Sequence, residues 1–199
     1  MDHTLIAQVA IAAAVAWGSG LRLYLVLFAL GILGRFAGFD LPETLSWLSH
    51  PISLGICGLL SVTEFFADKI LWLDSVWDAL HSFLRIPAGA ALAVTLLPEL
   101  GSGGMMALVA LIGGSVTASA QLTKTGTRAM INTSPEPFSN VAASFTEEGL
   151  LAAGFWTAFH HPLVFLVLLL VFIVLSAAMT FVFVRAIRRM FSTRKFQAT

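Results

Sequence analysis

The chain has 199 residues, of which 58% are hydrophobic and only 11% are charged. Soluble domains average about 25% charged residues, so this composition predicts an integral membrane protein. Because each membrane-spanning helix takes about 20 residues, a bundle of several spans would use nearly the whole chain and exclude a separate soluble catalytic domain. The basic and acidic residues balance to zero net charge, which gives no electrostatic reason to expect a nucleic-acid partner.

Six apolar stretches predict an all-α fold, a bundle of about six transmembrane helices that forms a single domain over residues 1–199. The predicted spans are residues 4–33, 50–66, 83–97, 104–122, 141–159 and 162–184. Two further segments, 64–85 and 141–160, carry charges within or beside the apolar runs and are candidates for re-entrant segments.

The first stretch, residues 4–33, is longer than the roughly 20 residues that cross a bilayer. It is interrupted by Gly18-Ser19-Gly20, and Arg22 follows shortly after. We predict that the helix breaks at Gly18–Gly20. The alternative is a strongly tilted helix, in which the small residues let a neighbouring helix approach closely.

The basic residues predict the orientation, because loops rich in Lys and Arg face the cytoplasm. The basic tail, residues 185–199, is therefore expected there, and counting back through six spans places both termini in the cytoplasm. Only Arg35 then lies outside. The basic residues placed inside are Lys69, Arg85, Lys124, Arg128, Arg185, Arg188, Arg189, Arg194 and Lys195. If residues 141–159 do not cross, five spans would place the N-terminus outside.

Charged and amide side chains inside the apolar stretches, or at their edges, are the candidate site. A charge at bilayer depth costs about 3 kcal/mol or more, so it usually faces the bundle interior and serves a function. The candidate ion- and substrate-binding residues are Arg22, Glu64, Asp68, Lys69, Asp74, Asp78, Arg85, Lys124, Arg128, Asn132, Asn140, Glu147 and Glu148. They predict a polar site in the cytoplasmic half of the bundle; the alternative is a purely structural ion-pair network.

Four acidic residues follow one another closely: Glu64, Asp68, Asp74 and Asp78. If the segment is helical, the first two share a helix face, and so do the last two. Such carboxylates could bind a divalent cation, carry protons or pair with Lys69 and Arg85. A metal site is therefore an open question, and any metal would lie on these four carboxylates.

Basic residues in two places could receive an anionic group. Lys124 and Arg128 are one helical turn apart, and together they offer a compact ammonium group and a planar guanidinium group. The polar run 132–140 that follows predicts a structured loop, with an ordinary basic cytoplasmic loop as the alternative. Arg22 lies too deep in its span to reach either surface, so we expect a carboxylate partner for it. The candidate partners are Glu64, Asp68, Glu147 and Glu148.

Four motifs carry a family resemblance across residues 15–150: Ser19-Gly-Leu-Arg22-Leu-Tyr24, Glu64-x-x-Ala-Asp68-Lys69, Lys124-x-Gly-Thr-Arg128 and Asn132-Thr-Ser-Pro-Glu-Pro-Phe-Ser-Asn140. They resemble a bacterial inner-membrane family known as a domain of unknown function. The resemblance implies a multi-pass protein of that membrane and supplies no activity. The family often has His where this chain has Gln121, which puts a titrating group at that position in doubt. The segment 64–69 is also similar to the Glu-x-Gly-Asp-Lys motif of cation/proton exchangers, although here it has one extra residue, lacks the glycine and occurs once.

The predicted function is a small multi-pass transporter or channel for an ion or a small polar or anionic solute, with its charged site open to the cytoplasm. One alternative is a membrane-embedded protein or enzyme that binds a lipid head group or a polyprenyl phosphate. Another is a structural or assembly factor. Because nucleotide-binding, zinc-protease and hydrolase motifs are missing from the sequence, we expect no cofactor and do not favour an enzyme. The expected partners are membrane lipids and a second copy of the chain.

Overall fold

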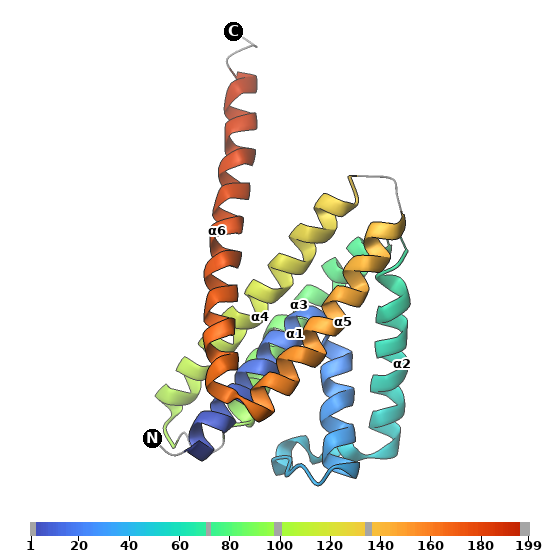
Figure 1. Ribbon diagram of the computed structural model, residues 1–199, viewed down its shortest axis with the longest axis vertical. Helices are drawn as coiled ribbons and strands as arrows, with labels where there is room; N and C mark the ends of the chain where they lie inside the picture. Colours follow the sequence, from blue (N-terminus) through green and yellow to red (C-terminus); the bar gives the residue numbers. More distant parts are fainter. Residues whose placement is uncertain (1–2, 71–72, 98–100, 134–136, 196–199) are drawn as a thin grey trace.

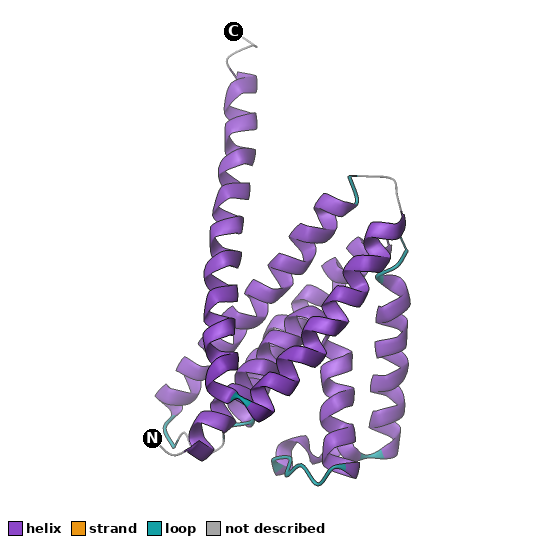
Figure 2. Ribbon diagram, viewed as in Figure 1, coloured by secondary structure: helices purple, strands orange, loops and turns teal. Residues whose placement is uncertain are grey.

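The computed structural model describes residues 3–70, 73–97, 101–133 and 137–195 (Figure 1). In this part of the chain every regular element is a helix (Figure 2). The elements are α1 (His3–Phe36), the short 3₁₀ helix η1 (Glu43–Ser49), α2 (Pro51–Ala67), α3 (Leu73–Thr95), α4 (Gly103–Ile131), α5 (Pro137–His160) and α6 (Pro162–Lys195). The prediction of an all-α membrane bundle is confirmed.

The first helix consists of two half-helices that fold back on each other at Arg22. The Arg22 backbone is extended, with φ −149° and ψ 85°, while the residues on both sides remain helical. A Cβ placed on Gly18 would lie 3.0 Å from the Val26 side chain, although eight residues of straight helix extend about 12 Å. Figure 1 shows α1 rising from its start into the middle of the bundle and then descending toward η1. Thus α1 is the re-entrant element of the fold.

The break predicted at Gly18–Gly20 is wrong in its position, because these residues remain helical. A Cβ on Gly20 would collide with the Thr117 backbone oxygen of α4, so this glycine is required for close packing of the two helices. The carbonyl oxygen of Leu21, which directly precedes the break, accepts a hydrogen bond from Lys124 Nζ at 3.2 Å. An unpaired carbonyl is costly away from water, so the break lies where a polar partner is available.

The later helices differ from the predicted spans in length. α2 matches the predicted second span, but α3 begins at Leu73 rather than residue 83, and α4 continues to Ile131 rather than residue 122. Residues 141–160 lie within one continuous helix, α5, so the predicted re-entrant segment there is wrong. The described part of residues 64–85 comprises the end of α2, a turn and the start of α3, and the chain reverses direction between these two helices (Figure 1). Hydropathy alone began α3 too late and ended α4 too early, because the polar portions of these helices are buried inside the protein instead of lying in water.

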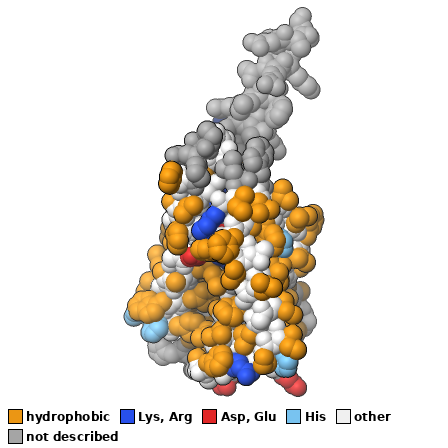
Figure 3. Space-filling model, turned by 90° about the vertical axis from the view of Figure 1, so that its right-hand side faces the viewer, with side chains coloured by type: hydrophobic (Ala, Val, Ile, Leu, Met, Phe, Trp, Pro, Cys, Tyr) orange, Lys and Arg blue, Asp and Glu red, His pale blue; other side chains and the backbone are white. Residues whose placement is uncertain are grey.

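Several helices are suited to a membrane. Within the described residues, three segments are long and apolar enough to cross: Leu5–Phe36, Gly103–Ile131 and Pro162–Val182. A fourth crossing results if η1 and α2, which meet at a bend of 72°, count as one span. Hydrophobic side chains also cover most of the face in Figure 3, and charged side chains gather at its lower edge. The molecule is therefore a helical membrane protein.

The two ends of the helical chain lie at opposite ends of the molecule. Figure 1 shows the start of α1 beside the turn between α5 and α6, whereas the end of α6 lies far above the bundle. α1 folds back toward the side on which it begins, and α2 to α6 then run alternately up and down (Figure 1). The prediction that both termini are cytoplasmic stays a prediction.

The folded-back α1 is the central element, because it contacts η1 and all five other helices. Its first half packs on α4, α5 and α6. There the Trp17 ring contacts the rings of Phe165 and Phe172 edge-on, with centroids 6.3 and 5.9 Å apart. Its second half packs on η1 and α2, and Phe28 fits against Gly58. The apex at Arg22 is thereby held in the bundle interior, where the polar residues of the other helices lie.

Gly20→Ala is expected to lower the free energy of unfolding by about 2 kcal/mol, because the added methyl group overpacks the α1–α4 contact. Gly126→Ala in α4 is the matched control, since a Cβ there meets nothing within 4 Å and alanine favours the helix by about 1 kcal/mol. Unfolding of the purified protein in detergent measures both changes. Equal stability of the two variants would contradict the close α1–α4 packing.

Candidate functional site

Charged side chains from α1 to α5 meet in the interior of the bundle and form what we call the charge cluster. Its members are Arg22, Glu64, Asp68, Asp78, Arg85, Lys124, Arg128, Glu147 and Glu148. The first seven are at most 2% exposed, which is unusual for charged residues unless they are paired. Four cations face five carboxylates, so attraction between the two offsets much of the cost of removing these charges from water.

Asp68 is the centre of one half of the cluster. It caps the C-terminus of α2, and its Oδ2 lies 2.9 Å from Arg22 Nη2. The same oxygen lies 3.1 Å from Lys124 Nζ and 3.9 Å from Arg128 Nη2. A single carboxylate therefore connects the apex of α1 and the end of α2 with two turns of α4.

Arg85 of α3 is the centre of the other half. Its guanidinium pairs with Glu64 through Nη2 and with Asp78 through Nη1, the latter at 2.7 Å. Nη1 also donates a 2.7 Å hydrogen bond to Oε1 of Gln121. Lys124 links the two halves, because its Nζ lies 3.3 Å from Asp78 as well as beside Asp68.

Arg128 attaches the beginning of α5 to this network. Its Nε and Nη2 donate to the two carboxylate oxygens of Glu147 at 3.2 and 3.1 Å, the two-pronged geometry that arginine favours. The guanidinium also donates to the backbone oxygens of Asp68 and Asn140 and to the Ser144 hydroxyl, each at 3.0 Å. Arg128 thus has hydrogen-bond partners on both α5 and the end of α2.

Helical spacing explains why these residues meet. On α4, buried Thr117, Gln121, Lys124 and Arg128 recur every three or four positions and form one stripe that faces the interior. On α5 the same spacing aligns Asn140, Ser144 and Glu147. The candidate set from sequence missed Gln121 and Ser144, because neutral polar residues in an apolar run resemble ordinary small or packing positions. Their place in the same stripe as the charged residues is the signal that could have found them.

Most remaining candidates lie beside the cluster. Asn140 donates from Nδ2 to Asn132 Oδ1 at 2.8 Å, so both amides support the contact with Arg128. Lys69 makes no ion pair with the described carboxylates; instead its Nζ lies 2.8 Å from the Phe65 ring centroid. Burial lowers the pKa of the Lys69 ammonium group, and the nearby Glu148 carboxylate opposes this effect. The side chain of Asp74 lies outside the described residues.

The partner prediction for Arg22 is confirmed for three of its four candidates. Besides Asp68, Nη2 of Arg22 lies 3.4 Å from Glu148 Oε1 and 3.8 Å from Glu147 Oε2. Glu64 is engaged by Arg85 instead.

Among the described residues, no group of three or more His, Cys, Asp or Glu side chains is arranged to hold a metal ion. The cause is visible at Glu64, Asp68 and Asp78, since each carboxylate faces an ammonium or guanidinium group that occupies the positions of a divalent cation. Of the four predicted metal ligands, only Asp74 has an undescribed side chain.

Several buried polar atoms within the described cluster make no hydrogen bond: Arg22 Nε and Nη2, Arg85 Nε, Glu64 Oε2, Asp78 Oδ2 and Glu148 Oε1. The Arg22 Nη2 atom lies within ion-pair distance of Asp68 but outside hydrogen-bond geometry. An unmatched buried donor or acceptor costs about 1–3 kcal/mol. The cluster, with its four cations and five carboxylates, thus keeps unused hydrogen-bonding capacity.

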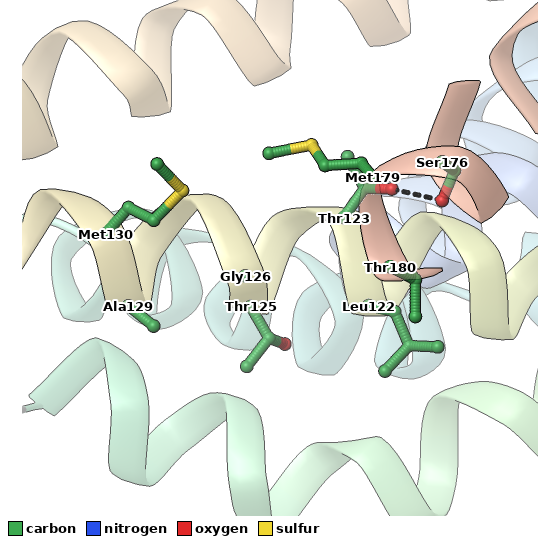
Figure 4. Close-up of a pocket in the computed structure, with 9 residues that line it drawn as sticks. All are labelled: Leu122, Thr123, Thr125, Gly126, Ala129, Met130, Ser176, Met179 and Thr180. Atoms are coloured by element: carbon green, nitrogen blue, oxygen red, sulfur yellow. Dashed lines mark hydrogen bonds between the residues drawn. The ribbon is translucent and has the colours of Figure 1, made fainter. Parts of the chain in front are cut away.

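Two hollows lie near the cluster or along α4. One, of about 390 Å³, lies between the second half of α1 and α5; its apolar lining includes Leu25, Phe155 and Phe159, and its single charged lining residue is Glu148. The other, of about 260 Å³, lies between α4 and α6 (Figure 4). There the Thr123 and Ser176 hydroxyls are 2.6 Å apart, and no lining residue is charged. Only the first hollow reaches the charge cluster.

The fold and the cluster together define a class: a helical membrane protein with a re-entrant first helix and a closed charged site between its helices. The chain belongs to the family described as a domain of unknown function (DUF4126), whose model matches residues 9–181. That range includes every member of the charge cluster, and it confirms the family resemblance found in the sequence. No curated protein and no solved structure matches the chain.

Proposed function

We propose that this protein is a secondary transporter for a small anionic solute in the bacterial inner membrane, and that the charge cluster is its transport site. The observation that carries this proposal is the position of Arg22. It lies at the non-helical apex of a re-entrant helix and faces buried carboxylates on two other helices. Broken helices that present charged or polar groups inside the membrane are typical of transporter binding sites.

The contacts of Arg22 support an exchange of partners. Glu148 is its most exposed partner, because the Glu148 side chain is 28% exposed, and its Oε1 makes no hydrogen bond. An entering anion could replace Glu148 at the guanidinium group.

The buried state of the cluster supports an occluded conformation rather than the open site predicted from sequence. Seven of its nine members are at most 2% exposed, and exposure is confined to Glu147 and Glu148 of α5. Alternating access would require some of these ion pairs to separate. Because the pairs connect α5 with α1 and α4, we propose that α5 moves relative to those helices.

The charge distribution supports one orientation. The end of α6 carries the basic segment that begins with exposed Arg185, and basic segments face the cytoplasm. The opposite end of the molecule, around η1, exposes Asp40 and Glu43 beside Arg35. We therefore place the start of α1 and η1 outside the cytoplasm and the end of α6 inside.

A second candidate function is the binding of an amphipathic lipid, favoured by the hollow between α1 and α5. Its apolar lining could hold an acyl or prenyl chain, with the polar group at Glu148. Mass spectrometry of lipids that remain bound through purification tests this candidate. One lipid retained by the wild type and lost in Phe155→Trp, which narrows the hollow, would favour it over transport of a soluble anion.

Flux into liposomes tests the proposed transport. We expect the reconstituted wild type to take up radiolabelled sulfate, phosphate or a small carboxylate from the outside. Arg22→Gln should reduce that flux at least about tenfold, because a charge-assisted hydrogen bond contributes about 1.5–3 kcal/mol. Arg35→Gln is the matched control, since Arg35 is exposed and lies far along α1 from the apex.

Each alternative outcome has a clear meaning. Wild-type flux equal to that of protein-free liposomes for every anion would refute the transport proposal. Equal losses in Arg22→Gln and Arg35→Gln would show that the effect comes from general damage to α1 and not from the cluster.

A further inference from the structure

The charge cluster is covered least at the boundary between α2 and α5. These two helices make almost no backbone contact, and side chains close the space between them. The Phe65 ring of α2 meets the Phe145 ring of α5 edge-on, with centroids 6.1 Å apart. The partly exposed cluster members, Glu147 and Glu148, belong to α5 at this same boundary. Figure 3, drawn from the side on which α2 lies, shows a small charged patch among hydrophobic side chains.

Lys69 lies on the outer side of the two rings at the boundary between α2 and α5. Its ammonium nitrogen lies 2.8 Å from the Phe65 ring centroid and 5.1 Å from that of Phe145, and it donates to the Phe65 carbonyl oxygen at 3.2 Å. A lysine usually reaches water or a carboxylate, and the face of an aromatic ring is a weaker partner, worth about 0.5–1 kcal/mol at exposed sites. Among the described carboxylates none lies within ion-pair distance of Lys69.

Arg22 lies near the Phe65 ring on the side that faces the charge cluster. Its Cζ atom is 5.8 Å from the Phe65 centroid, and the residue is 1% exposed. The Nε atom of this guanidinium makes no hydrogen bond. Phe65 therefore lies beside two cations: buried Arg22, which has an unused donor, and half-buried Lys69, which has no described carboxylate within ion-pair distance.

We propose that Arg22 and Lys69 form the entry site for a small oxyanion between α2 and α5, and that the Phe65 ring closes it. This inference rests on the proposed function and specifies where the solute enters. When the ring swings aside, the planar guanidinium and the flexible ammonium can bind two oxygens of one anion. The site favours an anion over a cation, because Asp68 and Glu148, the carboxylates closest to Arg22, already face its guanidinium at 2.9 and 3.4 Å.

Anion binding to the full-length protein in detergent tests the site without requiring transport. Sulfate and inorganic phosphate are titrated while the midpoint of thermal unfolding is followed, since a ligand of the folded state raises it. Lys69→Gln should weaken binding about tenfold, the loss of one charge-assisted hydrogen bond. Phe65→Ala should strengthen it about tenfold, because the open state no longer has to be populated against the ring contact.

Two matched controls accompany these variants. Arg185→Gln makes the same charge change on the exposed part of α6, and Phe138→Ala removes a ring that is 79% exposed on α5. Both should bind as the wild type does. A parallel titration with a short-chain phosphatidic acid decides whether the site binds a free oxyanion or the phosphate group of a lipid. If it stabilises the protein and free phosphate and sulfate do not, the entry site for a soluble oxyanion is refuted.

The remaining outcomes separate this inference from the transport proposal. Wild-type protein without any anion-dependent stabilisation, or Lys69→Gln with wild-type affinity, would overturn the entry site. Saturable binding that depends on Lys69, in a protein without flux, would support the site and refute transport. Flux that is unchanged in Lys69→Gln and Phe65→Ala would leave transport standing and show that the solute enters elsewhere.

Discussion

Asp68→Asn is expected to lower the free energy of unfolding by about 3–5 kcal/mol, the range for breaking a buried ion pair from one side. Asparagine keeps the size of the side chain but removes the charge that faces Arg22, Lys124 and Arg128. Lys124 and Arg128 retain other carboxylates, whereas Arg22 would depend on Glu147 and the partly exposed Glu148. The apex of α1 should therefore loosen first.

Unfolding in detergent with increasing denaturant measures this loss. Asp40→Asn is the matched control, because Asp40 is exposed at the opposite end of the molecule and a surface change of this kind usually stays within about 0.5 kcal/mol. A similar small effect of both substitutions would mean that the three cations do not depend on Asp68. The charge cluster would then lack the centre that the distances assign to it.

The helical class of this protein and its candidate site were predictable because both depend on local sequence. Long apolar runs predict helices in a membrane, and charges inside such runs are rare enough to indicate an interior site. Apart from Asp74, whose side chain is not described, each charged candidate lies in the cluster or beside it. Composition and position therefore identified which residues meet, without knowledge of the tertiary structure.

The fold-back of α1 could not be predicted in the same way. Gly18 and Gly20 are the usual indicators of a broken helix, yet close packing uses them and leaves them helical. The actual break at Arg22 depends on Lys124, which is far away in the sequence and accommodates the Leu21 carbonyl. Such a break depends on tertiary partners, and a local sequence pattern does not contain them.

The pairing within the cluster was predictable only in part. The sequence placed Glu64 among the partners of Arg22, but the helix arrangement gives Glu64 to Arg85. Charge balance by itself does not distinguish these pairings, since every cation could satisfy any carboxylate. The distances distinguish them: they divide the cluster into one half around Asp68 and another around Arg85, joined by Lys124. The two halves allow the structural role and the transport role to be tested separately.

In the half around Arg85, the double variant Glu64→Gln, Arg85→Gln is expected to be more stable than Arg85→Gln alone. The single variant leaves the Glu64 carboxylate buried without its cation, which costs about 3–5 kcal/mol. The double variant removes both charges, while Asp78 keeps Lys124 at 3.3 Å. The coupling energy between the two substitutions should reach about 2 kcal/mol, within the range for residues in one network.

The same double variant decides whether the cluster is more than a structural network. If the cluster is the transport site, the double variant should fold but lose anion flux at least about tenfold, because neutral amides replace charge-assisted contacts that contribute about 1.5–3 kcal/mol. A purely structural network predicts instead that flux recovers together with stability. Unfolding and liposome flux are therefore measured on the same preparations of the wild type, both single variants and the double variant. Flux that follows stability across all four proteins would refute the transport role of the charge cluster.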